Sequence, residues 1–158
     1  MTILILQGPN LNLLGKKSAE IGDSLTLNKL NRAIRLHVRK KEIKLKIVQT
    51  HKEYIALNFI QRNRNTADGC IVAPGAWSRN GYELLETIEL CSIPTVEVHF
   101  NIAFDSLGFS KDSILSEACI SSQTGNPYQA YSDALDTMKN YLTAKKLAKK
   151  ILKEEHIL

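Results

Sequence analysis

The feature that most constrains the fold is the alternation of short apolar runs with longer segments of helical periodicity. Apolar runs of this length are typical of buried strands, and apolar residues spaced by three and four are typical of helices that pack on one side. The predicted strands lie at 3–6, 43–50, 69–75, 93–100 and, more weakly, 118–122. The predicted helices lie at about 26–40, 53–64, 80–91 and from about residue 127 onward.

Strands that alternate with helices are joined by right-handed crossovers, which produces a parallel sheet covered on both faces. We therefore expect an α/β fold, a flavodoxin-like three-layer sandwich with a five-stranded parallel sheet. Residues 1–142 fit one compact domain. Residues 143–158 form a basic extension that either continues the last helix, with Leu147, Ile151 and Leu152 as an apolar edge for a neighbouring subunit, or frays into a tail.

Composition is that of an ordinary globular protein, with 44% hydrophobic and 23% charged residues. No apolar run approaches the roughly 18 residues of a membrane span, and the first ten residues lack the features of a signal peptide. We therefore expect a cytoplasmic protein without a membrane partner. The net charge of +5 comes mainly from 32–46 and 139–155, where lysines typically form a solvated face, so no nucleic-acid partner is expected.

The cysteines indicate neither a disulfide framework nor a metal site. Cys70, Cys91 and Cys119 are odd in number, lie far apart and form no CxxC pair. Each lies in or beside an apolar segment, so we expect small buried hydrophobic residues and no metal.

Ligands bind outside the carboxyl ends of the strands in an open parallel sheet. The segments that follow the predicted strands are rich in amides, hydroxyls and glycines, which suits a hydroxylated small molecule. They read "GPNLNLLGKK", "THKEY", "APGAWSRNGY", "HFNIAFDS" and "SSQTGNPY". The phosphate loop GxxxxGK[ST], the dinucleotide fingerprint GxGxxG and the serine elbow GxSxG are all absent from the sequence.

Two asparagines follow the first predicted strand, in a segment expected to be a loop. Asn10 and Asn12 come directly after Gly8 and Pro9. Their amides either orient a water or a substrate hydroxyl, or bond the backbone of the turn.

The four histidines differ in their expected roles. His99 ends the apolar run "VEVH", so its imidazole can reach the crevice and transfer a proton near neutral pH. His37 and His156 lie on lysine-rich helical segments and are expected to be solvated, while the role of His51 stays open.

Five short motifs occur in a fixed order along the chain. They are "GPNLNLLG" at 8–15, "TL" at 26–27, "ADG" at 67–69, "PGA" at 74–76 and "SIPTVEVH" at 92–99. In this order the chain resembles type II 3-dehydroquinate dehydratase over about residues 3–142. The resemblance implies the removal of water from 3-dehydroquinate to give 3-dehydroshikimate, in the shikimate pathway, without metal or organic cofactor. It also implies a homo-oligomer, in which trimers pack into a dodecamer.

The resemblance assigns roles to individual positions. In the family, a tyrosine made acidic by an arginine abstracts a proton, an asparagine holds a water on the enolate, and a histidine protonates the departing hydroxyl. The asparagine corresponds to Asn10 and the histidine to His99. The arginine position is occupied by Lys17 and the tyrosine position by Gly22.

Other positions of the family's site are matched or replaced. The asparagine before "PGA" becomes Ala73, the substrate-binding histidine falls at Arg79, and two later arginines align with Ser106 and Ser110. The predicted catalytic residues are Asn10, Lys17 and His99. The predicted residues around the substrate are Asn12, Ala73, Arg79, Glu86, Phe100, Asn101 and Ser110.

Three functions agree with this sequence. The first is an active lyase with repositioned catalytic groups, in which Lys16, Lys17 or Arg79 replaces positive charge or Tyr54 or Tyr82 reaches the crevice. The second is a catalytically deficient homologue that binds a ligand or a partner protein. The third is an enzyme for another polyol or cyclic carbonyl compound, with a pocket reshaped by Trp77 and Arg79. We favour loss or change of the family activity, because Gly22 has no side chain to accept a proton.

Overall fold

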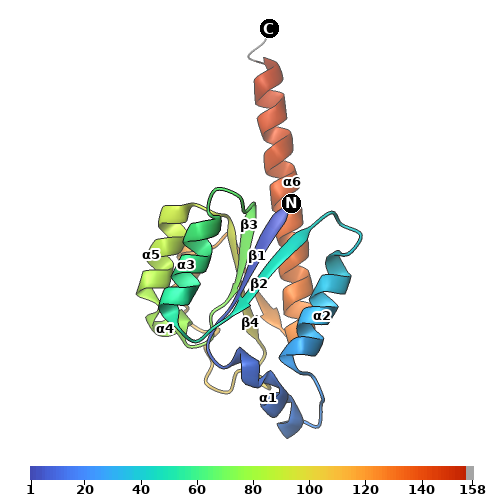
Figure 1. Cartoon of the computed structure of the whole chain (residues 1–158), viewed down its shortest axis with the longest axis vertical. Helices are drawn as coiled ribbons and strands as arrows, with labels where there is room; N and C mark the ends of the chain where they lie inside the picture. Colours follow the sequence, from blue (N-terminus) through green and yellow to red (C-terminus); the bar gives the residue numbers. More distant parts are fainter. Residues whose placement is uncertain (156–158) are drawn as a thin grey trace.

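The computed structural model of the chain describes residues 1–155. Its centre is one five-stranded parallel sheet in the order β2-β1-β3-β4-β5 (Figure 1). The predicted α/β fold with a five-stranded parallel sheet is therefore confirmed. The strands are β1 (Thr2–Gln7), β2 (Lys44–Gln49), β3 (Gly69–Ala73), β4 (Thr95–Phe100) and β5 (Ser121–Gly125).

Helices cover both faces of the sheet and complete the three layers. The pair α2 and α6 lies on one face, and the pair α3 and α5 lies on the other (Figure 1). No helix within residues 1–155 is both long enough and apolar enough to cross a membrane. The α-helices are α1 (Leu14–Glu20), α2 (Leu27–Val38), α3 (Glu53–Asn63), α4 (Trp77–Asn80), α5 (Tyr82–Cys91) and α6 (Pro127–Glu155).

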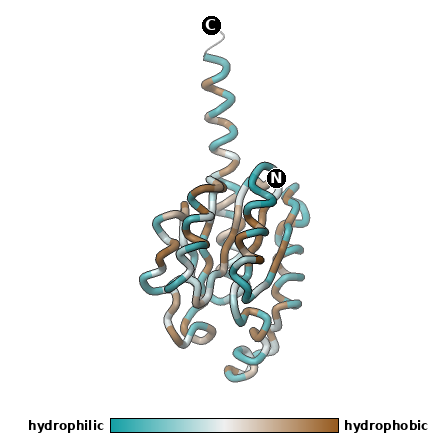
Figure 2. The backbone as a smooth tube through the Cα atoms, turned by 60° about the vertical axis from the view of Figure 1, so that its left-hand side comes forward, coloured by the Kyte–Doolittle hydropathy of each residue, from teal (hydrophilic) through white to brown (hydrophobic). Residues whose placement is uncertain are grey.

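Successive side chains of β1 point to opposite faces of the sheet, so they belong to two separate clusters of the core. Ile3 and Ile5 point toward α2 and α6, whereas Leu4 and Leu6 point toward α3 and α5. Successive side chains of a strand face opposite sides, so a strand buried on both faces is apolar throughout. Figure 2 shows these hydrophobic segments gathered inside the body of the molecule.

The segment after β1 is not the loop that the sequence suggested. It forms a 3-10 helix, η1 (Leu11–Leu13), followed directly by α1. Leu14 and Ser18, one helical turn apart, are both buried, and the Ser18 hydroxyl donates to the Leu25 carbonyl at 2.6 Å. These tertiary contacts stabilise a helix in a segment whose polar composition indicated a loop.

The fifth strand also lies further along the chain than predicted. It begins at Ser121 instead of residue 118, because Ser116–Ala118 form the 3-10 helix η2. The Ile120 N–H donates to the Thr95 carbonyl at 2.8 Å, which sets the start of pairing between β5 and β4.

The basic extension is helical up to Glu155 and projects beyond the body of the molecule (Figure 1). Of the two alternatives from the sequence, the structure therefore has the continued helix and not the frayed tail. Residues 143–155 are all exposed. The division of the chain at residue 142 stays a prediction, and His156 lies outside the described residues.

The prediction that His37 is solvated is wrong. Its side chain is only 16% exposed, and its Nε2 lies 2.9 Å from Asp136 Oδ1 on α6. Lys41 Nζ donates to the same oxygen at 2.7 Å, so the three groups join α2 to α6. His51, by contrast, is exposed.

Candidate active site

A cavity of about 220 Å³ lies at the carboxyl edge of the sheet, where the ends of β3 and β4 meet the segment after β1 and the segment after β4. This is the edge at which ligands bind in open parallel sheets. The residues that line it are Pro9, Asn10, Leu11, Lys17, Ala73, Gly75, Ala76, Val98, His99, Phe100, Phe104, Asp105, Ser106, Leu107 and Phe109.

A close approach of two backbone segments brings Asn10 to this cavity. The Gly8 N–H donates to the Ala73 carbonyl at 2.9 Å, which ties the end of β1 to the end of β3. A Cβ atom at Gly8 would lie 2.6 Å from the carbonyl oxygen of Pro74, so only glycine fits here. Asn10 follows in the left-handed conformation, with φ 67°, which asparagine tolerates better than most residues.

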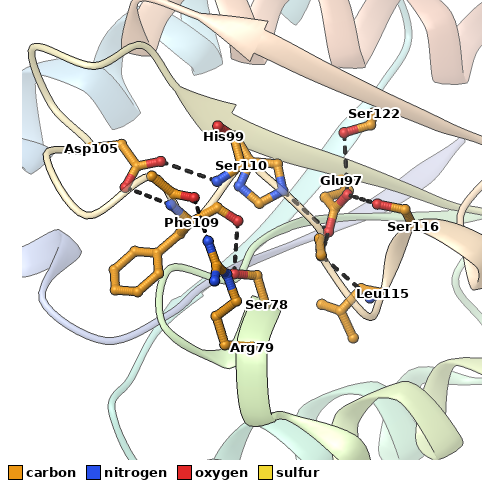
Figure 3. A network of polar contacts seen from close by, with 12 residues as sticks. Ser78, Arg79, Glu97, His99, Asp105, Phe109, Ser110, Leu115, Ser116 and Ser122 are labelled. Carbon is orange, nitrogen blue, oxygen red and sulfur yellow. Dashed lines mark hydrogen bonds and ion pairs between the residues drawn. The ribbon is translucent and has the colours of Figure 1, made fainter.

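His99 and Glu97 form a buried pair on β4. They are two residues apart and therefore point to the same side of the strand. His99 Nε2 lies 3.1 Å from Glu97 Oε2, and the side chains are 3% and 0% exposed (Figure 3). His99 Nε2 makes no regular hydrogen bond with the described residues, so its contact with Glu97 is an ion pair when the ring carries a proton.

Three serine hydroxyls hold the Glu97 carboxylate. Ser113 Oγ donates to Oε2, while Ser116 Oγ and Ser122 Oγ donate to Oε1 at 2.8 and 3.1 Å (Figure 3). Burial of the carboxylate opposes its ionisation, but the contacts with His99, Ser113 and Ser116 outweigh it and lower the pKa of Glu97 below its usual value. Glu97 is therefore a charged group in the core that fixes the position of the His99 ring.

The segment after β4 folds over the cavity through polar contacts of Asp105. The carboxylate accepts the N–H groups of Phe109 at 3.0 Å and Ser110 at 3.1 Å (Figure 3). From α4, Ser78 Oγ donates to the Phe109 carbonyl at 2.9 Å and Arg79 Nη2 donates to the Gly108 carbonyl at 2.7 Å. These contacts give residues 105–110 a defined path beside the site.

Lys17 connects α1 to the same segment. Its Nζ donates to the Phe104 carbonyl at 3.0 Å, and its side chain lines the cavity. An ammonium group has three donors, so two remain to contact a ligand.

The structure brings together half of the residues that the sequence indicated. Asn10, Lys17, Ala73, His99 and Phe100 line the cavity. Five others lie outside this lining, and their roles stay predictions. These are Asn12, Arg79, Glu86, Asn101 and Ser110.

Arg79 and Glu86 are exposed on α4 and α5, and Asn12 is exposed on η1. Ser110 is half-buried and bonds to Asp105 through its backbone. Asn101 is half-buried, and its Oδ1 accepts no hydrogen bond from the described residues. Gly22 is exposed in the turn after α1, with φ 74°.

Two residues that hold parts of the site in place were not predicted from the sequence. Glu97 is an acidic residue inside an apolar strand, and its spacing from His99 is a signal that could have identified it. Asp105 carried no comparable signal, because its partners are backbone groups of a segment without periodicity.

The family of the chain follows from comparison with known proteins. Residues 1–139 match the family model described as Dehydroquinase class II. The chain belongs to the class II dehydroquinase family. The sheet order, the cavity at its carboxyl edge and the positions of Asn10 and His99 are thus features of a member of this family.

Proteins named 3-dehydroquinate dehydratase or type II dehydroquinase match nearly the whole chain. The 3-dehydroquinate dehydratase of Clostridium botulinum (strain Okra / Type B1) is 30% identical over 144 residues, which cover 91% of this chain and 98% of the relative. That of Clostridium acetobutylicum is 31% identical over 143 residues, with coverage of 90% and 99%. The crystal structure of type II dehydroquinase from Butyrivibrio crossotus is 27% identical, has a TM-score of 0.78, and matches 87% of this chain and 97% of that one. The family and the flavodoxin-like fold expected from the sequence are confirmed.

Proposed function

We propose that this member of the class II dehydroquinase family binds a small cyclic carboxylate in the cavity and has lost most of the family's dehydration activity. One observation carries the proposal. Asn10 and His99 line one cavity, whereas no tyrosine is among the lining residues of the described chain. Gly22, which the family resemblance matches to the base tyrosine, is exposed. The site keeps the groups of the acid half of the reaction and lacks the base.

The retained groups have defined chemical roles. The His99 ring, positioned by Glu97, can donate a proton to a leaving hydroxyl or take one from a ligand. The Asn10 amide can hold a water or a carbonyl oxygen at the rim. A positioned general base contributes about a hundred- to ten-thousand-fold in rate, so its loss alone reduces turnover by that factor.

A second candidate function is a lyase for another cyclic carbonyl compound. Lys17 favours it, because its amine lines the same cavity as His99. A lysine amine that gives up its proton can act as a general base. In this function Lys17 removes a proton beside the carbonyl, and His99 protonates the leaving group.

Calorimetric titration with 3-dehydroquinate tests the binding part of the proposal. We expect saturable binding with little conversion of the ligand during the titration, and weaker binding to the His99→Ala and Asn10→Ala variants. Glu89→Ala is the matched control, because Glu89 is exposed on α5, lies outside the cavity and is not among the residues predicted around the substrate. Absence of binding by 3-dehydroquinate and by other cyclic carboxylates contradicts the proposal.

We also propose that the protein acts in the cytoplasm as a homo-oligomer, with the trimer-based dodecamer as the expected assembly. The apolar edge of the projecting helix supports an assembly of copies, since Leu147 and Ile151 are 59% and 47% exposed one turn apart. A biosynthetic enzyme family of this kind supports the location.

A further inference from the structure

The wall of the cavity is mostly apolar. Nine of its lining residues have hydrocarbon side chains, and three of these are phenylalanines. The rings of Phe100 and Phe104 meet edge to face, with centroids 6.4 Å apart. Leu107, which is 74% exposed, lies at the mouth of the cavity and not in the core. A ligand in this cavity therefore meets hydrocarbon over most of its surface.

The polar groups of the cavity are few, and several already have partners. Both oxygens of Asp105 accept backbone N–H groups, and one proton of Lys17 Nζ goes to the Phe104 carbonyl. What remains for a ligand is positive charge from Lys17, a ring nitrogen of His99, the Asn10 amide and the Ser106 hydroxyl. This set suits one anionic group and offers few partners for several ring hydroxyls.

Unpaired hydroxyls are unfavourable in such a place. A ligand hydroxyl that leaves water for an apolar wall loses its hydrogen bonds and gains none. An apolar ring face, by contrast, is stabilised by contact with phenylalanine rings and with Leu107. A volume of about 220 Å³ accommodates a single ring with a small substituent.

We propose that the cavity selects a compact cyclic carboxylate with an unsubstituted, apolar ring over a polyhydroxylated one of the same size. The carboxylate lies toward Lys17 and His99, and the ring lies among Phe104, Leu107 and Phe109. The inference rests on the proposed binding function of this cavity and names its ligand class.

The test compares benzoate with quinate, which has the same carboxylate and ring size but carries four ring hydroxyls. Binding to the full-length protein is measured by protein-observed NMR, with the His99 ring and Leu107 methyl signals as reporters. We expect benzoate to bind at least about tenfold more tightly than quinate, a difference of about 1.4 kcal/mol. The signals of both reporters should shift on addition of benzoate.

Two serine variants on one exposed segment separate the cavity wall from general surface effects. Leu107→Ser should weaken benzoate severalfold, because Leu107 lines the cavity. Ile102→Ser is the matched control, since Ile102 is 84% exposed and does not line the cavity, and it should leave benzoate binding unchanged.

The results that would overturn the proposed ligand class differ from those that would overturn the binding function. If quinate or 3-dehydroquinate binds as tightly as benzoate or more tightly, the ligand class is wrong while the binding function stands. Equal losses in both serine variants also overturn the inference, because the wall then plays no part. If none of these ligands shifts His99, both the inference and the proposed function fail.

Discussion

His99 Nε2 lies 3.1 Å from Glu97 Oε2, on neighbouring inward positions of β4, and the same carboxylate accepts three serine hydroxyls. These serines come from the segment before η2, from η2 itself and from β5. The position of the His99 ring therefore depends on the packing of β5 beside β4. This pair links the stability of the fold to the chemistry of the site.

Replacing Glu97 by Gln should destabilise the protein by about 1–3 kcal/mol at neutral pH, because the serine hydroxyls and His99 lose their ionised partner. The pKa of Glu97 is lowered in the folded state, while an unfolded glutamate titrates near 4.3. The stability that its charge supplies is thus present above that value and is lost as pH falls through the lower folded pKa. Urea unfolding at several pH values measures this. If the free energies of unfolding of the unchanged protein and of Glu97→Gln differ by the same amount at pH 7 and at pH 3, the prediction is wrong.

Asp136→Asn provides a matched control for the buried carboxylate. Asp136 also contacts a histidine and a second polar group, His37 and Lys41, but its side chain is 48% exposed. Solvent screens such a pair, so the free energy of unfolding should change by less than about 1 kcal/mol. If Asp136→Asn lowers the free energy of unfolding as much as Glu97→Gln does, burial is not the reason why the two carboxylates differ.

Gly8→Ala should destabilise the protein by about 1–3 kcal/mol, because the added methyl group is forced against the Pro74 carbonyl. The end of β1 would then move away from β3 and displace Asn10 from the cavity. Thermal unfolding and ligand titration measure the two effects. Gly125→Ala is the control, since its methyl group meets only ordinary contacts of 3.8 Å or more. If Gly8→Ala and Gly125→Ala lower the unfolding temperature and the ligand affinity equally, the close contact between Gly8 and the Pro74 carbonyl does not carry this effect.

Removal of residues 143–158 should leave the free energy of unfolding of the body within about 0.5 kcal/mol, because residues 143–155 are exposed. The mass measured by light scattering should fall, because the apolar edge of the projecting helix is the contact that we propose between copies of the chain. Leu147→Asp with Ile151→Asp should act in the same way. Lys153→Asp should not, because it changes a charge on the same exposed helix without removing an apolar side chain. An unchanged mass in both the truncated and the Leu147/Ile151 variants excludes this helix as a contact between copies.

The sequence sufficed for the parts of the structure that depend on local pattern. The apolar run of β1 and the spacing of Leu30 and Ile34 in α2 are signals within a few residues, and both elements form as predicted. Asn10 and His99 could be predicted to lie at the cavity because each is within three residues of the carboxyl end of a strand, β1 for Asn10 and β4 for His99. The carboxyl ends of parallel strands meet at one edge, so order along the chain was enough.

The remaining features depend on contacts between distant segments. The helix α1 requires the burial of Leu14 and Ser18 against other parts of the chain, and its own composition does not indicate it. Asp105 acts through backbone groups whose positions are set by α4. Such contacts have no periodicity in the sequence, so pattern analysis cannot find them.

We propose that the site has kept its acid, His99, and has lost its base. The most direct measurement is the rate at which the purified protein converts 3-dehydroquinate, followed through the absorbance of the conjugated enone product. We expect turnover at least about a hundredfold below the rate of a 3-dehydroquinate dehydratase assayed alongside, because a positioned base is lost. Turnover equal to that of the relative, abolished by His99→Ala, would contradict it.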